Sequence, residues 1–409
     1  MSLGWGWRGY IGGGSFGAMI PGAMVALVIC RLAGLNAGRT AAATAMSAVG
    51  VGFGGEMTYG QTVGFVRQPE TVGWGLLGLA LKGGVWGLLG GAVVGVGFHS
   101  ASGRGGRLFA ALVGLIAGTA AGWAAVNRTK LLYFSDPMDR PREEVWAGLL
   151  LGALALLVVY VIGRADARPV VRFAWAGALG GWFGFGGGGL WIYLGSTALS
   201  APEWVPWWKL MEFTFGLSFG AALGWAAWRS REWLAPRAEA PEEGGARSPL
   251  GLEVALWSAA AVGLFMASNW IPLRFGYTVL GAGLLFTAAH WARSRWWIAL
   301  AATAAAFFLD WYDYVREQPP WGSLALGAAI TAVATVTFCW MTLTALRGGE
   351  LGARQAFWLL AGWATVTSWG RVVLLGTYTA NEFAEHALFF ALLGLTAWLG
   401  RGVDVRTAV

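Results

Sequence analysis

The stretch that decides the fold is Val72-Gly-Trp-Gly-Leu-Leu-Gly-Leu-Ala-Leu-Lys-Gly-Gly-Val-Trp-Gly-Leu-Leu-Gly-Gly-Ala-Val-Val-Gly-Val-Gly-Phe98. Its only charged residue is Lys82. About 20 consecutive apolar residues are enough for a helix to cross the hydrocarbon core of a bilayer. The stretch therefore predicts a membrane-spanning helix that carries one buried charge.

Apolar segments of similar length recur along the whole chain. Hydrophobic residues make up 57% of the sequence and charged residues 12%, against about 25% charged in ordinary soluble proteins. The segments lie near 9–34, 41–66, 72–98, 107–126, 146–163, 173–199, 208–228, 252–271, 275–292, 296–310, 322–345, 355–376 and 383–400. Only helices satisfy the backbone inside lipid for segments of this length. We predict an all-α polytopic bundle of 12–13 transmembrane helices, the lower number applying if 275–292 and 296–310 form one re-entrant pair.

A polar stretch, 229–250, divides the chain. It contains three prolines, four glutamates and the pair Gly244-Gly245, a composition that cannot pack a core. The sequence predicts a Gly-rich transmembrane half of about seven helices at 1–228. A polar cytoplasmic linker at 229–250 then leads to an Ala- and Trp-rich half of about six helices at 251–409.

Two segments of the first half resemble each other. Residues 82–95 align with 211–224, and the alignment matches three pairs of glycines: Gly87 with Gly216, Gly91 with Gly220, and Gly95 with Gly224. Transporters carry internal repeats of this kind. Gly-rich composition alone produces the same likeness, so an internal duplication and a chance similarity both stay open.

Glycines recur every four residues in three segments, as Gly83–Gly95, Gly180–Gly188 and Gly216–Gly224. At 3.6 residues per turn they form smooth stripes that let helix backbones approach closely. The alternative is that the glycines leave room for a substrate. We favour close packing, either within the chain or against protein partners.

The basic residues of the connections indicate an orientation. When the connections are assigned alternately to two sides, the richer side contains 17 basic residues, all arginines. The poorer side contains nine: Arg8, Arg67, Arg128, Lys130, Arg140, Arg142, Lys209, Arg274 and Arg316. The positive-inside rule makes the richer side cytoplasmic. We expect a multi-pass protein of the bacterial inner membrane, with its N-terminus outside and its C-terminus in the cytoplasm.

Charges within the apolar segments are the best functional candidates, because each costs about 2.5–3.5 kcal/mol or more at mid-bilayer. Glu56 and Lys82 lie at matching distances from the turn at 67–71, so we predict that they interact in the outer half of the bilayer. The pair has either a functional role or a purely structural one. Glu212, Arg371 and Glu385 are further candidates.

Asp310 completes the set of candidate substrate- or ion-binding residues. With Asp313 it could chelate a cation or act in acid–base chemistry. The surrounding Asp310-Trp-Tyr-Asp-Tyr-Val-Arg-Glu317 also reads as an aromatic belt at the membrane surface, which we favour. No catalytic residue is assigned.

Several classes of function are excluded. Cys30 and Cys339 stand alone in apolar segments, and the three histidines are separated by whole helices, so we expect no metal site. No nucleotide, protease or kinase motif occurs, and no cofactor is expected. The net charge of +7 is spread over short loops, which argues against a nucleic-acid partner.

The features together favour a secondary transporter or channel with a polar site in the outer half of the bilayer. Two alternatives remain. One is a scaffold or accessory subunit of a membrane complex, and the other is a membrane-embedded enzyme for a lipid-linked or periplasmic substrate. The expected partners are the lipid bilayer, a small molecule or ion, and proteins that pack on Gly- and Trp-rich helix faces.

Overall fold

The computed structural model is helical, with no strand among the residues that it describes. Those residues are 1–11, 13–99, 105–135, 143–198, 202–235, 248–270, 274–317, 324–349, 351–375 and 379–401. The prediction of an all-α fold is confirmed. The linker residues 236–247 lie outside the described ranges, so the division into two halves stays a prediction.

The helices before the linker are α1 (Ser2–Tyr10), α2 (Gly14–Leu32), α3 (Ala37–Gly52), η1 (Phe53–Glu56), α4 (Gly60–Val66), α5 (Val72–His99), α6 (Gly105–Gly122), η2 (Trp123–Asn127), α7 (Trp146–Val161), η3 (Ala165–Ala167), α8 (Arg168–Tyr193), η4 (Leu194–Ala198), α9 (Trp207–Arg229) and α10 (Arg231–Leu234). Those after it are α11 (Leu250–Trp270), α12 (Gly276–His290), α13 (Ala292–Trp296), η5 (Trp297–Ala301), α14 (Ala302–Glu317), α15 (Leu324–Arg347), α16 (Ala353–Leu375) and α17 (Ala380–Arg401). Here η1 and η3 are 3₁₀ helices, whereas η2, η4 and η5 are π-helices.

Seven helices in the described part are long and apolar enough to cross a membrane. They are Gly14–Leu32, Val72–His99, Gly106–Asn127, Trp207–Arg229, Leu250–Ala267, Ala325–Arg347 and Ala380–Gly400. Other predicted segments form shorter helices, such as the 16 residues of α3 and α7. The larger number of 12–13 spanning helices stays a prediction.

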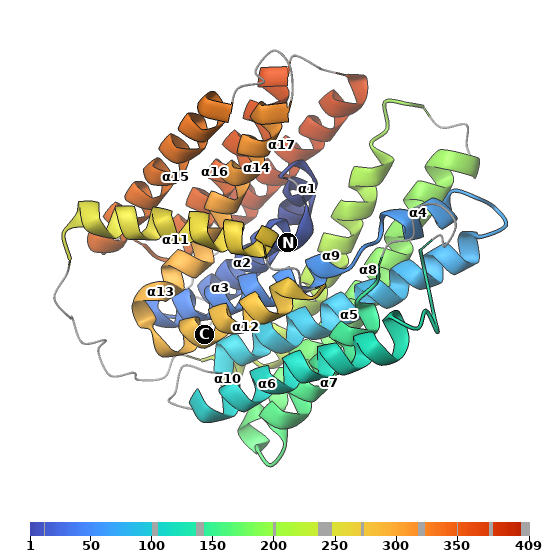
Figure 1. Ribbon diagram of the computed structural model, residues 1–409, viewed down its shortest axis with the longest axis horizontal. Coiled ribbons are helices and arrows are strands. Elements are labelled where there is room, and N and C mark those ends of the chain that lie inside the picture. The colour runs from blue at the N-terminus through green and yellow to red at the C-terminus, as the bar shows by residue number, and fades with distance from the viewer. Residues whose placement is uncertain are drawn as a thin grey trace.

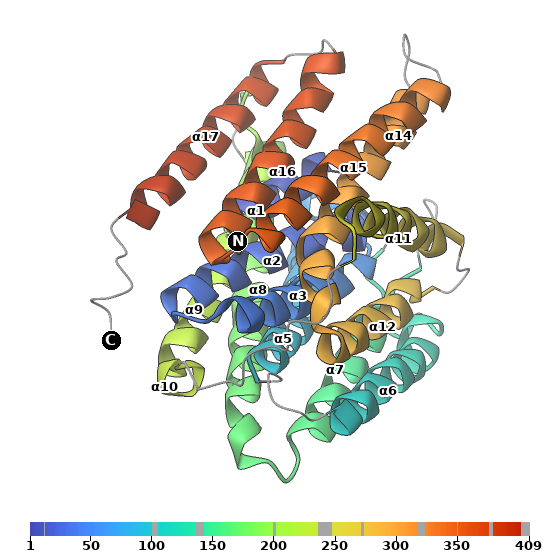
Figure 2. The same ribbon diagram turned by 90° about the vertical axis from the view of Figure 1, so that its left-hand side faces the viewer.

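The helices after the linker pack directly on those before it. In Figure 1 and Figure 2, α2 and α3 lie in the middle of the molecule, with α14 to α17 on one side and α6, α7 and α12 on the other. Helix α2 contacts α14 and α16, while α12 contacts α3 and α6. Helices α2 and α3 are therefore covered by other helices on both sides.

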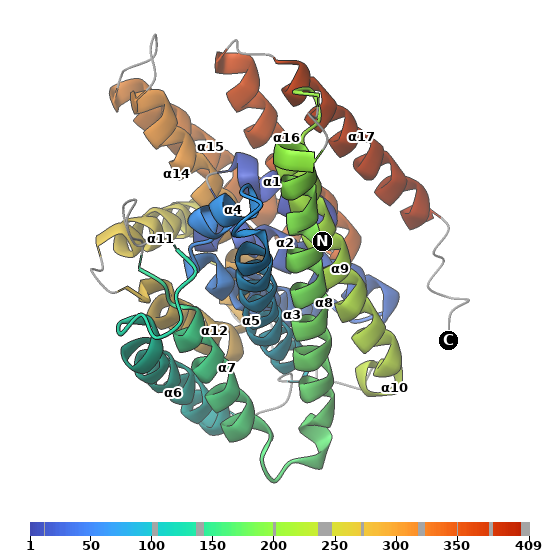
Figure 3. The same cartoon turned by 90° about the vertical axis from the view of Figure 1, so that its right-hand side faces the viewer.

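The Gly-rich stripes pack within the chain. A Cβ atom on Gly87 of α5 would lie 1.8 Å from the carbonyl oxygen of Gly177 in α8, and one on Gly83 would lie 2.3 Å from that of Gly181. Figure 3 shows α5 and α8 side by side. Contacts this short require both helices to lack side chains at the crossing, which confirms close packing for this stripe.

The prediction that segments 9–34 and 41–66 each form one continuous helix is wrong, because both helices are interrupted. Segment 9–34 begins as α1, which ends at Tyr10, and resumes as α2 at Gly14 with positive φ angles at Gly13 (73°) and Gly14 (59°). Segment 41–66 ends as α3 at Gly52, passes through η1 and an extended residue, Met57 (ψ 124°), and resumes as α4. The left-handed backbone that glycine permits at the first interruption is what ends the helix there.

Candidate functional site

The two interruptions touch each other. A Cβ atom on Gly55 would lie 2.4 Å from both the carbonyl oxygen of Gly14 and the Cα atom of Ser15. The turn between α1 and α2 thus lies backbone to backbone against the end of η1. We call the place where residues 13–15 meet residues 54–59 the paired helix breaks.

Arg8 lies at the paired helix breaks and is buried, with 4% of its surface exposed. Its Nη1 donates a hydrogen bond to the Tyr59 hydroxyl at 2.8 Å. The guanidinium carbon lies 5.2 Å from the ring centre of Trp5 and 5.1 Å from that of Trp86. Its Nε is buried without a hydrogen-bond partner, and no ion pair joins it to a carboxylate in the described ranges. The aromatic rings stabilise the cation without neutralising it.

The sequence-based assignment of Arg8 to a connection is therefore wrong, because Arg8 lies in the buried helix α1. The side of the membrane to which it was assigned stays a prediction. The helix that holds it, α1, packs along α9, where the Ser2 hydroxyl donates to the Phe213 carbonyl at 2.9 Å. The surrounding Trp5-Gly-Trp-Arg8 offered a signal, because aromatic residues next to an arginine favour a desolvated cation. Counting the charges of the connections does not detect such a buried cation.

Lys209 was also assigned to an outer connection, and it too is buried, at 6% exposure. Its ammonium group donates to Glu212 Oε2 at 2.8 Å and to the Gly6 carbonyl at 3.2 Å. It lies 4.4 Å from the ring centre of Tyr10. Glu212, a predicted site residue, is thus held beside α1 by a neighbour one helical turn away.

Glu385 reaches the same region from α17. Its carboxylate accepts a hydrogen bond from the Tyr10 hydroxyl. His386 follows it, and its ring lies 5.6 Å from that of Tyr10. Two of the predicted site residues, Glu212 and Glu385, therefore both lie beside α1, although they come from opposite sides of the linker. We call Arg8, Tyr10, Tyr59, Lys209, Glu212 and Glu385 the α1 polar centre.

Known proteins offer no guide to this polar centre. No protein-family model, curated protein or solved structure matches the chain. Its function is therefore argued from the geometry of the described residues.

The predicted pairing of Lys82 with Glu56 is wrong. The Lys82 ammonium group lies 2.6 Å from Glu144 Oε1, 2.6 Å from the Thr58 carbonyl and 2.8 Å from the Thr62 hydroxyl. These three acceptors use all three of its N–H donors. Glu56 therefore has no role in neutralising it.

The carboxylate that pairs with Lys82 is Glu144, which lies in the connection between η2 and α7. Glu144 also accepts hydrogen bonds from the Ser135 hydroxyl at 3.1 Å and the Phe134 amide at 3.1 Å. The side chains of Lys82 and Glu144 are each 1% exposed. A buried pair with every donor and acceptor satisfied fixes the connection to α5 and has no free group for a ligand.

Glu56 instead caps a helix. Its carboxylate accepts the backbone N–H of Thr278 at 3.1 Å and also the Thr278 hydroxyl. Thr278 lies in the first turn of α12, whose N-cap residue, Phe275, makes no side-chain capping bond. A carboxylate at a helix N-terminus is favoured by the unpaired N–H groups and the helix dipole. Glu56, the last residue of η1, thus links the interrupted segment 41–66 to α12, which follows the linker.

The side chains of the remaining two candidates, Arg371 in α16 and Asp310 in α14, lie outside the described residues, as does that of Asp313. Their predicted roles stay predictions. Within the described ranges, no group of three or more His, Cys, Asp and Glu side chains is placed to hold a metal ion.

Proposed function

We propose that the protein is a membrane transporter or channel for a small anionic solute, and that the solute passes Arg8 at the paired helix breaks. The observation that carries the proposal is the buried guanidinium of Arg8, which has no carboxylate partner at the contact of two interrupted helices. Secondary transporters bind substrates where discontinuous helices meet near the middle of the bilayer.

The choice of an anion follows from charge. Lys209 is paired with Glu212, whereas Arg8 faces the Tyr59 hydroxyl and aromatic rings. A buried cation gains most from an opposite charge when water is excluded. A small anion that reaches Arg8 would supply that charge and would meet the unpartnered Nε.

The α1 polar centre also supplies a joint between the two sides of the linker. Tyr10 bonds to Glu385 of α17, and Lys209 of α9 bonds to the carbonyl of Gly6 in α1. A rocking motion of one half against the other would exchange these few polar contacts for solvent. Transport by alternating access needs bistable contacts of this kind.

The proposal is tested with purified protein in liposomes on a solid-supported membrane. Rapid exchange to chloride, phosphate, acetate or glutamate is expected to give a transient current with at least one of these anions. Replacing Arg8→Gln should reduce that current about tenfold or more, the loss expected when a charge-assisted hydrogen bond is removed. Tyr59→Phe, which keeps the ring, should reduce it less.

The matched control is Arg168→Gln, which removes an exposed arginine at the start of α8. This variant should keep the wild-type current. Equal currents from wild-type and Arg8→Gln protein, with both eluting as a single folded species, would count against the proposal. Absence of current with every anion would favour the scaffold alternative.

A further inference from the structure

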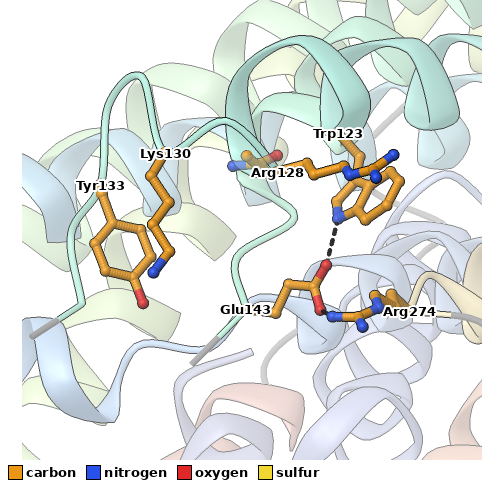
Figure 4. A pocket seen from close by; sticks show the side chains of 7 residues that line it. Trp123, Arg128, Lys130, Tyr133, Glu143 and Arg274 are labelled. Atoms are coloured by element: carbon orange, nitrogen blue, oxygen red, sulfur yellow. Dashed lines mark hydrogen bonds and ion pairs between the residues drawn. The ribbon is translucent and has the colours of Figure 1, made fainter. Parts of the chain in front are cut away.

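A second polar site lies apart from the α1 polar centre, where the chain leaves η2 and approaches α7. A cavity of about 540 Å³ there is lined by Trp123, Arg128, Lys130, Tyr133, Glu143 and Arg274, together with Asn127 (Figure 4). This volume falls within the range of about 300–1,000 Å³ that small-molecule sites occupy. We call it the α6–α7 pocket.

One wall of the pocket is fixed by Glu143. Its Oε1 accepts a hydrogen bond from the Trp123 indole at 2.8 Å, and its Oε2 is paired with Arg274 (Figure 4). Glu143 is the only carboxylate among the described residues of the lining. Because both of its oxygens are engaged, it holds one cation in place and does not neutralise the others.

Arg128 and Lys130 supply the excess positive charge. The Arg128 guanidinium lies 5.9 Å from the Trp123 ring, and the Lys130 ammonium lies 5.1 Å from the Tyr133 ring. Neither forms an ion pair with a carboxylate in the part of the chain that the structure describes. Both line the pocket, Lys130 beside Tyr133 on one side and Arg128 beside Trp123 on the other (Figure 4).

A buried donor without a partner also points to a ligand. Asn127 is 3% exposed, and its Oδ1 accepts the backbone N–H groups of Ala147 and Gly148 at 3.1 Å. Its Nδ2 is buried and has no hydrogen-bond partner. Buried amide donors are nearly always satisfied. An acceptor from a bound molecule would complete the set.

The backbone that carries Asn127, Arg128 and Lys130 adopts two conformations that are rare in proteins. Residues Trp123–Asn127 form a π-helix, and Lys130 has a φ of 53°, a left-handed conformation that a lysine rarely adopts. Single π-helical turns and such outliers occur often at functional sites. Here they turn the side chains of 127, 128 and 130 from one short segment toward one cavity.

We propose that the α6–α7 pocket binds a phosphate-bearing head group. The guanidinium and ammonium groups would contact the phosphate oxygens, the Asn127 amide would donate to a third, and Trp123 and Tyr133 would pack on the attached apolar carbons. A phospholipid of the bilayer and a soluble phosphate ester share this chemistry. The pocket has one Trp and one Tyr in its lining, the two residue types that are enriched at the head-group level of a membrane.

Native mass spectrometry of the full-length protein in detergent tests the proposal. Phosphatidylglycerol, phosphatidylcholine, glycerol 3-phosphate and inorganic phosphate are titrated separately. We expect phosphatidylglycerol to bind, and the double variant Arg128→Gln/Lys130→Gln to bind it about tenfold or more weakly, because each substitution removes a charge-assisted contact. The single variant Arg128→Gln provides an intermediate value should the double variant be unstable.

The matched control is Arg168→Gln/Arg231→Gln, which removes two exposed arginines beyond the opposite end of α7 and lowers the net charge equally. It should leave the affinity unchanged. Binding of glycerol 3-phosphate that is lost only in the pocket variant supports the proposal with a soluble ligand. An equal loss in control and pocket variants, or no binding of any probe to wild-type protein, overturns it.

Discussion

Replacing Lys82 with methionine is expected to lower the free energy of unfolding by about 3–5 kcal/mol, the usual cost of removing one partner of a buried ion pair. The reason is that Glu144, 1% exposed, would keep its charge with no cation nearby and only two neutral donors, from Phe134 and Ser135. Denaturation by sodium dodecyl sulfate in mixed micelles measures the change.

The double variant Lys82→Met/Glu144→Gln should recover most of that loss, because neither side chain would then carry a charge. The comparison variant Lys82→Met/Glu56→Gln should recover none of it. If Glu56→Gln restored stability and Glu144→Gln did not, the pairing seen in the structure would be wrong and the partner inferred from sequence would be right.

Replacing Gly87 with alanine is expected to destabilise the protein by about 2–3 kcal/mol, within the range found for overpacked cores. The added Cβ would lie 1.8 Å from the Gly177 carbonyl oxygen, so α5 and α8 would have to move apart along their whole contact. A backbone carbonyl cannot turn aside as a flexible side chain can. The midpoint of detergent denaturation should fall accordingly.

Gly187→Ala is the matched control, since it lies in α8 and a Cβ there would meet nothing within 4 Å. This substitution should leave stability unchanged or raise it by up to about 1 kcal/mol, because alanine favours a helix over glycine. Similar losses from the two substitutions would show that helix propensity or lipid contact, not backbone approach, governs the stripe.

The sequence predicted those features that depend on composition and helical period. Long apolar runs are enough to establish the all-helical class, and a four-residue glycine period is enough to predict a close helix crossing such as that of Gly87 with Gly177. Charges that interrupt apolar segments were also identified, and two of them, Glu212 and Glu385, lie beside α1 in the structure.

Features that depend on contacts between distant segments could not be predicted in this way. The partner of Lys82 lies in a polar connection, where a carboxylate gives no sign that it is buried. The helix interruptions, one between Tyr10 and Gly14 and one at residues 57–59, fall in Gly-rich, apolar sequence. Hydropathy does not distinguish an interrupted helix from a continuous one there. Arg8 was misplaced for the related reason that its burial depends on distant residues, Tyr59 and Trp86 of α5.

The contact of α1 with α9 has a consequence for the order of assembly. The Ser2 hydroxyl bonds to a carbonyl 211 residues later in the chain. At a synthesis rate of about 5–20 residues per second, α1 would be made roughly 10–40 seconds before the part of α9 on which it packs. During that time Arg8 would have neither Tyr59 in its final position nor the shelter of the finished bundle. The hairpin of α1 and α2 would therefore need to be held by the insertion machinery or at the lipid surface, and the polar centre would close as one of the last events of biogenesis.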